Sequence, residues 1–167
     1  NAKGSVEGVN PANDQPVSRR VADDEPFSAF VFKTVADNFV GRQSLIKVMS
    51  GTLSSGREVR NANTGKMEKI NQVNTMVGKK PVQLDVLHAG DIGTLAKLSV
   101  NTGETLCDSA NQIRYPSIEF PAPCIAMAVA AEKPGEEDKV FGGLSRLQEE
   151  DPSFTVSKSP TTGETLL

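Results

Sequence analysis

Short runs of β-branched and aromatic residues, separated by turns that contain glycine, recur between residues 26 and 115. The first run, "PFSAFVFKTV" at residues 26–35, is apolar at consecutive positions, which is typical of a strand buried on both faces. Turn signals follow at a spacing of about ten residues. This pattern predicts an all-β barrel or sandwich, and a closed barrel would pair the edges of so many short strands.

The individual strands can be placed from the same alternation. The predicted strands are residues 26–35, 42–51, 57–62 and 67–77, with two more after the turns "HAGD" and "NTGE". Residues 67–77 are predicted as one long strand with a bulge, because Ile70 and Met76 drift across the alternation. The turn "NTGK" predicts a positive φ at Gly65.

Residues 1–25 are polar, rich in Asn, Pro, Asp and Ser, and show no periodicity. They are predicted to be a linker or an arm. The first two residues, Asn1 and Ala2, are interpreted as a tag remnant and are excluded from fold reasoning.

A different pattern begins at Pro116. Three prolines lead into an apolar strand, and residues 133–152 predict a helix, with Val140, Leu144 and Leu147 at i, i+4 and i+7. Gly142 and Gly143 cost that helix about 1 kcal/mol each relative to alanine, so we expect them to pack closely on a sheet. A final hairpin turns at "PTTG".

Residues 116–167 therefore predict a partial α+β unit of β-α-β-β order, the beginning of a ferredoxin-like split βαβ fold. A complete unit of this kind needs another helix and strand, so we expect truncation. The overall prediction is mainly β: a tag remnant and a linker or arm at 1–25, a β-barrel at 26–115 and this partial unit at 116–167.

Charge divides between the two predicted domains. Residues 26–115 carry eleven Lys and Arg against seven Asp and Glu, whereas residues 116–167 carry four against nine. This asymmetry suggests different partners for the two parts. No apolar run approaches the length of a membrane span, and no secretory signal is visible, so we expect a cytoplasmic protein without a membrane partner.

The spacing of Gly51 and Gly56 matches the glycines of a phosphate-binding P-loop, G-x-x-x-x-G-K-[S/T]. Arg57 and Glu58 then stand where the P-loop has its lysine and its magnesium-binding hydroxyl, and a carboxylate there would repel phosphate oxygens. A polar, β-branched stretch follows in place of a helix. The segment is therefore predicted to be a hairpin turn, and no cofactor is expected to bind it.

Catalytic and metal-binding candidates are few. His88 precedes a turn, and the sequence does not identify a Ser or Cys nucleophile that it could activate. We therefore interpret it as a partly buried structural histidine. Cys107 and Cys124 lie outside any C-x-x-C motif and are expected to be free thiols in a reducing compartment. The acidic residues at 149–151 end a helix and point apart, which favours a solvated surface over a metal site.

A basic segment is the strongest binding candidate. It contains six cations against two carboxylates, namely Arg57, Arg60, Lys66, Lys69, Lys79 and Lys80 against Glu58 and Glu68. No aromatic residue lies between positions 40 and 114, which disfavours base stacking on single strands. One interpretation is that the basic segment recognises folded RNA by charge and shape. The other interpretation is an ordinary solvated surface, which composition alone favours.

Several blocks resemble, in order and spacing, the second domain of bacterial elongation factor G. These are "DDEPFSAFVFKT", "VGRQSLIKVMSGTLSSG", "HAGDIGTL" and "NTGETLCD". The stretches "FPAPCIAMAV", "EEDKVFGGLSRLQEEDPSF" and "TTGET" are similar to the start of that factor's third domain. The resemblance covers about residues 20–167.

The resemblance implies a non-catalytic fragment of a translational GTPase, whose GTP and Mg²⁺ are bound by a domain outside this chain. In the family, the second domain docks on small-subunit rRNA and on the GTPase domain. Carried over by position, the rRNA-facing candidates are Arg42, Lys66, Lys69, Lys79 and Lys80. Residues expected to shape turns are Gly51, Gly56, Gly90, Asp91, Thr102, Gly103 and Thr105.

Other interpretations stay open from the sequence. The parent protein is expected to be a translocase, a paralogue or a ribosomal-protection relative. Outside that class, the chain would be a stand-alone barrel module that binds folded RNA or protein, or a scaffold without a nucleic-acid role.

Overall fold

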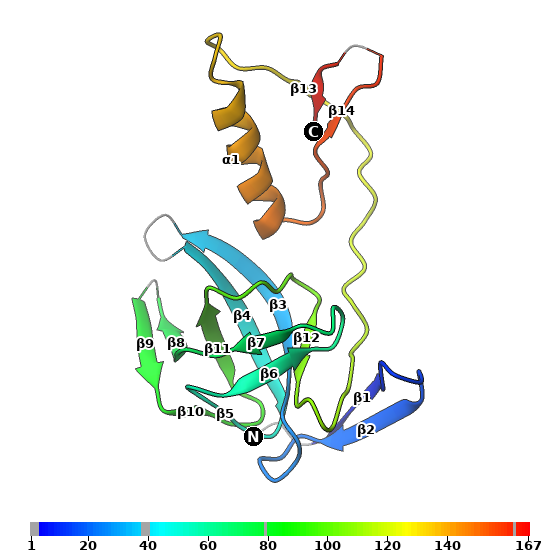
Figure 1. Ribbon diagram of the computed structural model, residues 1–167, viewed down its shortest axis with the longest axis vertical. Helices are drawn as coiled ribbons and strands as arrows, with labels where there is room; N and C mark the ends of the chain where they lie inside the picture. The colour runs from blue at the N-terminus through cyan, green and yellow to red at the C-terminus, as the bar shows by residue number, and fades with distance from the viewer. Residues whose placement is uncertain (1–3, 38–40, 79, 162) are drawn as a thin grey trace. The chain divides into compact units, whose positions relative to one another are not determined.

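The computed structural model describes residues 4–37, 41–78, 80–161 and 163–167. The chain divides into two units, residues 1–118 and 119–167 (Figure 1). Within the described residues, no helix is long and apolar enough to span a membrane.

An antiparallel sheet of eight strands dominates the first unit. Its order is β7-β6-β12-β3-β4-β11-β8-β9. The strands are β3 (Ser28–Asp37), β4 (Gly41–Ser50), β6 (Glu58–Asn61), β7 (Met67–Lys69), β8 (Val73–Val77), β9 (Lys80–Leu84), β11 (Ile92–Ala96) and β12 (Thr105–Cys107). Two short strands, β5 (Leu53–Ser54) and β10 (Val86–Leu87), pair with each other. The sheet curls into a half-barrel, which confirms the mainly β prediction.

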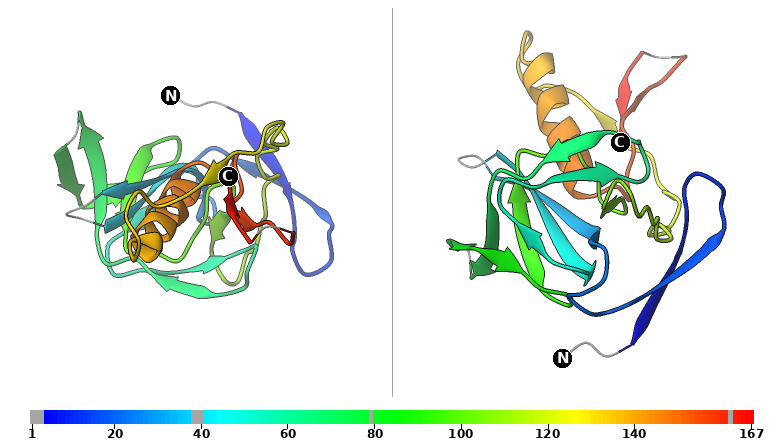
Figure 2. Two further views of the ribbon diagram at one scale, coloured as in Figure 1. Left: turned by 90° about the horizontal axis from the view of Figure 1, so that it is seen from above. Right: turned by 60° about the horizontal axis from the view of Figure 1, so that its bottom comes forward.

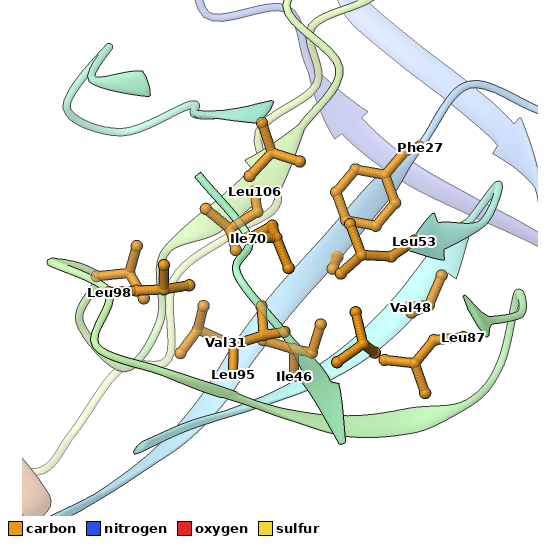
Figure 3. Close-up of a cluster of buried hydrophobic side chains, with 14 residues drawn as sticks. Phe27, Val31, Ile46, Val48, Leu53, Ile70, Leu87, Leu95, Leu98 and Leu106 are labelled. Carbon is orange, nitrogen blue, oxygen red and sulfur yellow. The ribbon is translucent and has the colours of Figure 1, made fainter. Parts of the chain in front are cut away.

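The curled sheet encloses one apolar cluster, shown in Figure 3. Phe27, Val31, Ile46, Leu95 and Leu106 are among its members, and each is at most 1% exposed. Burial of one such side chain contributes about 1.5–3 kcal/mol. The cluster therefore fixes which face of each strand points inward.

The chain between β6 and β8 corrects the sequence prediction. The expected long strand at 67–77 is two strands, β7 on β6 and β8 between β11 and β9. Buried Ile70 separates them: its N–H donates to Arg57 O and its carbonyl accepts from Gly56 N–H. These two hydrogen bonds hold Ile70 against the turn at 56–57 and end strand β7. Two register shifts lie instead in the pairing of β3 with β4, one between Ser28 and Ala29 and one between Val31 and Lys33.

Residues 5–20, within the segment predicted to be a linker or an arm, contain two strands. β1 (Ser5–Val9) and β2 (Pro16–Arg20) form an antiparallel hairpin at the side of the half-barrel (Figure 2). Val9 exchanges two backbone hydrogen bonds with Arg114. Val6 and Val17 pack on a second apolar cluster, formed by Ala62, Cys107, Ile113 and Tyr115. Two widely spaced valines supply this packing, too few to produce a periodicity. Asn1 and Ala2 lie outside the described residues.

The second unit contains β13 (Ala128–Val129), α1 (Glu137–Glu150), β14 (Ser157–Lys158) and β15 (Thr165–Leu166). Its sheet order is β13-β15-β14, so the predicted β-α-β-β order is present. Leu144 is buried as expected, whereas Leu147 is 53% exposed. The expected close packing of Gly142 and Gly143 is wrong, because a Cβ at either position would meet no described atom within 4 Å.

Two buried acids in the second cluster make stability depend on alkaline pH. Burial raises the pKa of the Cys107 thiol and of the Tyr115 phenol above their ordinary values of 9.0 and 10.0. The Tyr115 hydroxyl lies 2.7 Å from Ser28 Oγ. The folded state binds both protons more tightly than the unfolded state does. The contribution of these two groups to the free energy of unfolding is therefore complete below pH about 9 and is lost as the pH rises.

We therefore expect the urea midpoint of the wild type to fall between pH 8 and pH 10. A Tyr115→Phe, Cys107→Ala double variant should show a flatter dependence over the same range. Equal slopes for the two proteins, measured by circular dichroism, would contradict this assignment.

Candidate functional site

The lysines predicted to face RNA lie on both edge strands of the sheet. Lys66 precedes β7 and Lys69 is its last residue. Both are exposed, and β7 is the first strand in the sheet order. Lys80 is exposed at the start of β9, the last strand. Lys79 lies outside the described residues. Lys66 and Lys69 thus belong to one edge of the sheet and Lys80 to the opposite edge strand.

Arg42 is held by the connection between β11 and β12. Its Nη2 donates to Val100 O at 2.5 Å and to Asn101 Oδ1 at 2.7 Å, and the side chain is half-buried. A guanidinium fixed in this way shapes the connecting loop. This position is therefore structural as well as basic.

Arg57 is also engaged within the barrel. Its Nη2 lies 3.0 Å from Asp108 Oδ2, its Nη1 donates to Thr52 O at 2.7 Å, and its guanidinium carbon lies 5.2 Å from the Phe27 ring centroid. The Ala110 backbone N–H and then the Arg57 guanidinium lower the pKa of Asp108. Because a carboxylate neutralises Arg57 locally, the exposed lysines carry most of the free positive charge of this segment.

His88 differs from its prediction, because it is exposed rather than partly buried. Its Nδ1 lies 2.8 Å from Asp23 Oδ2, and Asp23 Oδ1 accepts the Ala89 N–H at 2.9 Å. The Ala89 N–H and then His88 lower the pKa of Asp23. The pair joins the 22–25 turn to the 88–91 turn, which is a structural role.

Strand alternation places a set of uncharged polar side chains on one outer face of the sheet. They line a recess of about 210 Å³, here named the amide recess: Gln43, Gln72, Asn74, Gln83 and Thr94, with Pro81 and Ala96. The sequence analysis did not single out these residues. Their signal is a polar residue at corresponding positions of neighbouring strands, which is visible only when the register is known.

No group of three or more His, Cys, Asp or Glu residues is arranged to hold a metal ion in the described part of the chain. Cys107 is a buried free thiol and Cys124 an exposed one. The acidic residues at 149–151 end α1, and Asp151 is its C-cap.

Family comparison assigns both halves of the chain. Residues 26–109 match the family described as elongation factor G domain 2, and residues 120–167 match elongation factor G, domain III. The chain belongs to the elongation factor G family. The two matched segments of this elongation factor G chain are domain 2 and domain III.

A solved structure of a protein from Thermus thermophilus has the same fold. It superposes with a TM-score of 0.76 at 24% sequence identity, covering 86% of this chain and 22% of the other chain. The elongation factor G segment described here therefore spans about a fifth of that protein.

The P-loop-like spacing belongs to turns of domain 2. Gly51 ends β4 with φ +68°, and Gly56 precedes β6 with φ +82°. The segment continues into strand β6 and not into a helix. The predicted hairpin is wrong in one respect: β4 and β6 do not pair, and β5 between them pairs with β10.

The remaining predicted turn residues lie at two connections of the same domain. Gly90 has φ +96°, and Asp91 Oδ2 accepts the His88 N–H at 2.9 Å. Gly103 has φ +89°, and Thr102 Oγ1 lies 3.1 Å from Thr34 Oγ1. Buried Thr105 Oγ1 accepts the Tyr115 N–H at 3.0 Å.

Proposed function

We propose that this chain is the docking middle of a translational GTPase of the elongation factor G type. In this proposal the barrel binds small-subunit rRNA and the GTPase domain of its parent protein in the cytoplasm. GTP and Mg²⁺ are bound by another domain of the parent protein. The parent protein uses GTP to drive translocation or a related ribosomal step. The consecutive matches to domain 2 and domain III carry the proposal.

The charge of the barrel supports an RNA partner. Residues 26–115 have a formal balance of +4, from eleven basic and seven acidic residues. Lys66, Lys69 and Lys80 are exposed on edge strands, where a phosphate backbone has access to them. Arg42 acts by holding the 100–101 loop. Such contacts give affinity by charge and shape without base stacking.

Binding to purified small ribosomal subunits tests the proposal. We expect the Lys66→Glu, Lys69→Glu variant and the Lys79→Glu, Lys80→Glu variant each to lose about tenfold in affinity at low salt. Each should also flatten the plot of log affinity against log salt concentration by about one unit per lost phosphate contact.

A Lys139→Glu, Arg146→Glu variant makes the same change in net charge on exposed positions of α1, in the acidic second unit. It should leave the salt slope unchanged. If all three variants behave alike, the effect is one of net charge and the assignment of the barrel lysines fails. If the wild type binds isolated folded RNA but no subunit, the stand-alone RNA-binding module replaces this proposal.

A further inference from the structure

We propose that Glu104 is a positioning residue for RNA binding by the barrel. Its carboxylate joins the loop that Arg42 holds to the turn that carries Lys66, and it thereby fixes the place at which Lys66 meets a phosphate. The inference rests on the proposed function, because that function assigns Lys66 to an RNA partner.

A continuous chain of hydrogen bonds runs through the Glu104 carboxylate. On one side, Asn101 Nδ2 donates to Oε1 at 3.1 Å and the Asn101 N–H donates to Oε2 at 2.9 Å. On the other side, Asn61 Nδ2 donates to Oε2 at 2.7 Å, and the backbone N–H of Asn61 donates to Lys66 O at 2.8 Å. Since Arg42 Nη2 donates to Asn101 Oδ1, the chain of contacts extends from Arg42 to Lys66.

Asn61, the last residue of β6, shapes the turn that carries Lys66. Its side chain is fully buried, and its Oδ1 accepts the backbone N–H groups of Asn63 and Thr64 at 2.9 and 3.2 Å. Its backbone carbonyl accepts the Gly65 N–H at 2.8 Å. A short polar side chain that accepts backbone N–H groups two and three residues on stabilises a tight turn. The orientation of this carboxamide therefore sets the path of the chain through the turn.

The groups around position 104 all present hydrogen-bond donors to it. Arg42 can only donate, so it orients the Asn101 oxygen toward itself and the Asn101 NH₂ group toward Glu104. The backbone N–H groups at 63 and 64 orient the Asn61 carboxamide in the same way, with its NH₂ group toward Glu104. A carboxylate accepts from both carboxamides. Glutamine would keep one oxygen for Asn61, and leucine would accept from neither.

The charge of Glu104 opposes RNA binding, which makes its position and its charge separable. Glu104 is half-buried, and the donors to its carboxylate within the described residues are neutral amides. Removal of a carboxylate near an RNA-binding surface raises the affinity for phosphate by charge alone. Displacement of Lys66 lowers the same affinity. The two effects therefore have opposite signs.

Binding to purified small ribosomal subunits tests the inference with charge-matched variants. We expect Glu104→Leu to lower the affinity about threefold and to flatten the salt slope by about one unit, the share of one phosphate contact. Glu104→Gln loses the same charge but keeps an acceptor for Asn61, so it should bind at least as well as the wild type. Glu58→Leu, which removes an exposed carboxylate of β6, should not lower the affinity either. Equal or higher affinity for all three variants overturns the inference.

A double-variant cycle shows whether Glu104 acts through Lys66. In a Lys66→Gln background, Glu104→Leu should no longer lower the affinity, because the contact that it displaces is already absent. An equal loss with and without Lys66 would show that the carboxylate acts elsewhere, and it would overturn the inference.

Amide hydrogen exchange, followed by nuclear magnetic resonance, measures the hold on the turn without the ribosome. In Glu104→Leu the Asn63 and Thr64 amides, which donate to Asn61 Oδ1, should exchange about tenfold faster. The Val48 amide, which donates to a backbone carbonyl at 91, should keep its rate. Glu104→Ala, with the same expected result, replaces the leucine variant if the latter does not fold.

The exchange measurement separates failure of this inference from failure of the proposed function. Unchanged exchange at 63 and 64 in the variant overturns the role of Glu104, whatever the ribosome binding. If the wild type binds no small subunit while the substitution speeds exchange at 63 and 64, the proposed ribosomal function is refuted and the hold of Glu104 on the turn stands.

Discussion

Replacing Gly51 with alanine is expected to lower the free energy of unfolding of the barrel by about 3 kcal/mol. Gly51 has φ +68°, a left-handed conformation that costs other residues about 1 kcal/mol. An added Cβ would also lie 2.6 Å from Glu25 O and 2.7 Å from Phe27 Cα. Both atoms are backbone, so relief requires movement of the segment that leads into β3.

Gly56→Ala provides the matched control. Gly56 has φ +82°, but a Cβ there would meet no described atom within 4 Å. Only the conformational cost remains, about 1 kcal/mol. Urea unfolding followed by circular dichroism measures both variants. Equal losses for Gly51→Ala and Gly56→Ala would show that the close approach to Glu25 and Phe27 is not a constraint.

Arg19→Met is expected to cost about 3 kcal/mol and to detach the β1–β2 hairpin from the barrel. Arg19 is only 6% exposed, and its guanidinium donates to the carbonyls of Pro26, Phe27 and Asn111. Methionine keeps an unbranched apolar stem in place of the arginine methylenes and removes all three hydrogen bonds. Pro26 O keeps the Ser50 hydroxyl as a donor and Phe27 O keeps the Asp108 N–H, so the penalty comes from the loss of three bonds to a charged donor.

Arg20→Met, at the next position, is the control for this prediction. Arg20 is exposed, and its ion pairs with Asp24 and Glu25 lie at the surface, so we expect no measurable change in stability. Amide hydrogen exchange of residues 5–20 should rise in Arg19→Met and stay low in Arg20→Met. Protection retained in both variants would refute the role of Arg19 as the tie between hairpin and barrel.

The sequence predicts some parts of this fold and not others. The strand β3 was predictable because residues 26–35 form a long apolar run, and α1 because Leu144 lies in a helical period. The β1–β2 hairpin was not predictable, because from the sequence alone Arg19 is indistinguishable from a surface arginine. Only the structure shows that it binds three carbonyl groups. The division of 67–77 into β7 and β8 likewise depends on the capture of Ile70 by residues 56–57.

The candidate site follows the same rule. The lysines at 66, 69 and 80 were found from charge density along the chain, a local signal. The amide recess joins positions 43, 74, 83 and 94 from four strands. Only the sheet register brings them together, so a scan along the sequence cannot find them.

Directed hydroxyl-radical probing of the small subunit tests the docking claim most directly. An iron chelate would be attached to a Thr64→Cys, Cys124→Ser variant, since Thr64 lies exposed in the turn before β7 and the remaining Cys107 is buried. The account predicts cleavage of small-subunit rRNA at a limited set of positions, and its loss when Lys66 and Lys69 are replaced by glutamate. Absence of cleavage above that of a chelate-free control would contradict docking of this barrel on the ribosome.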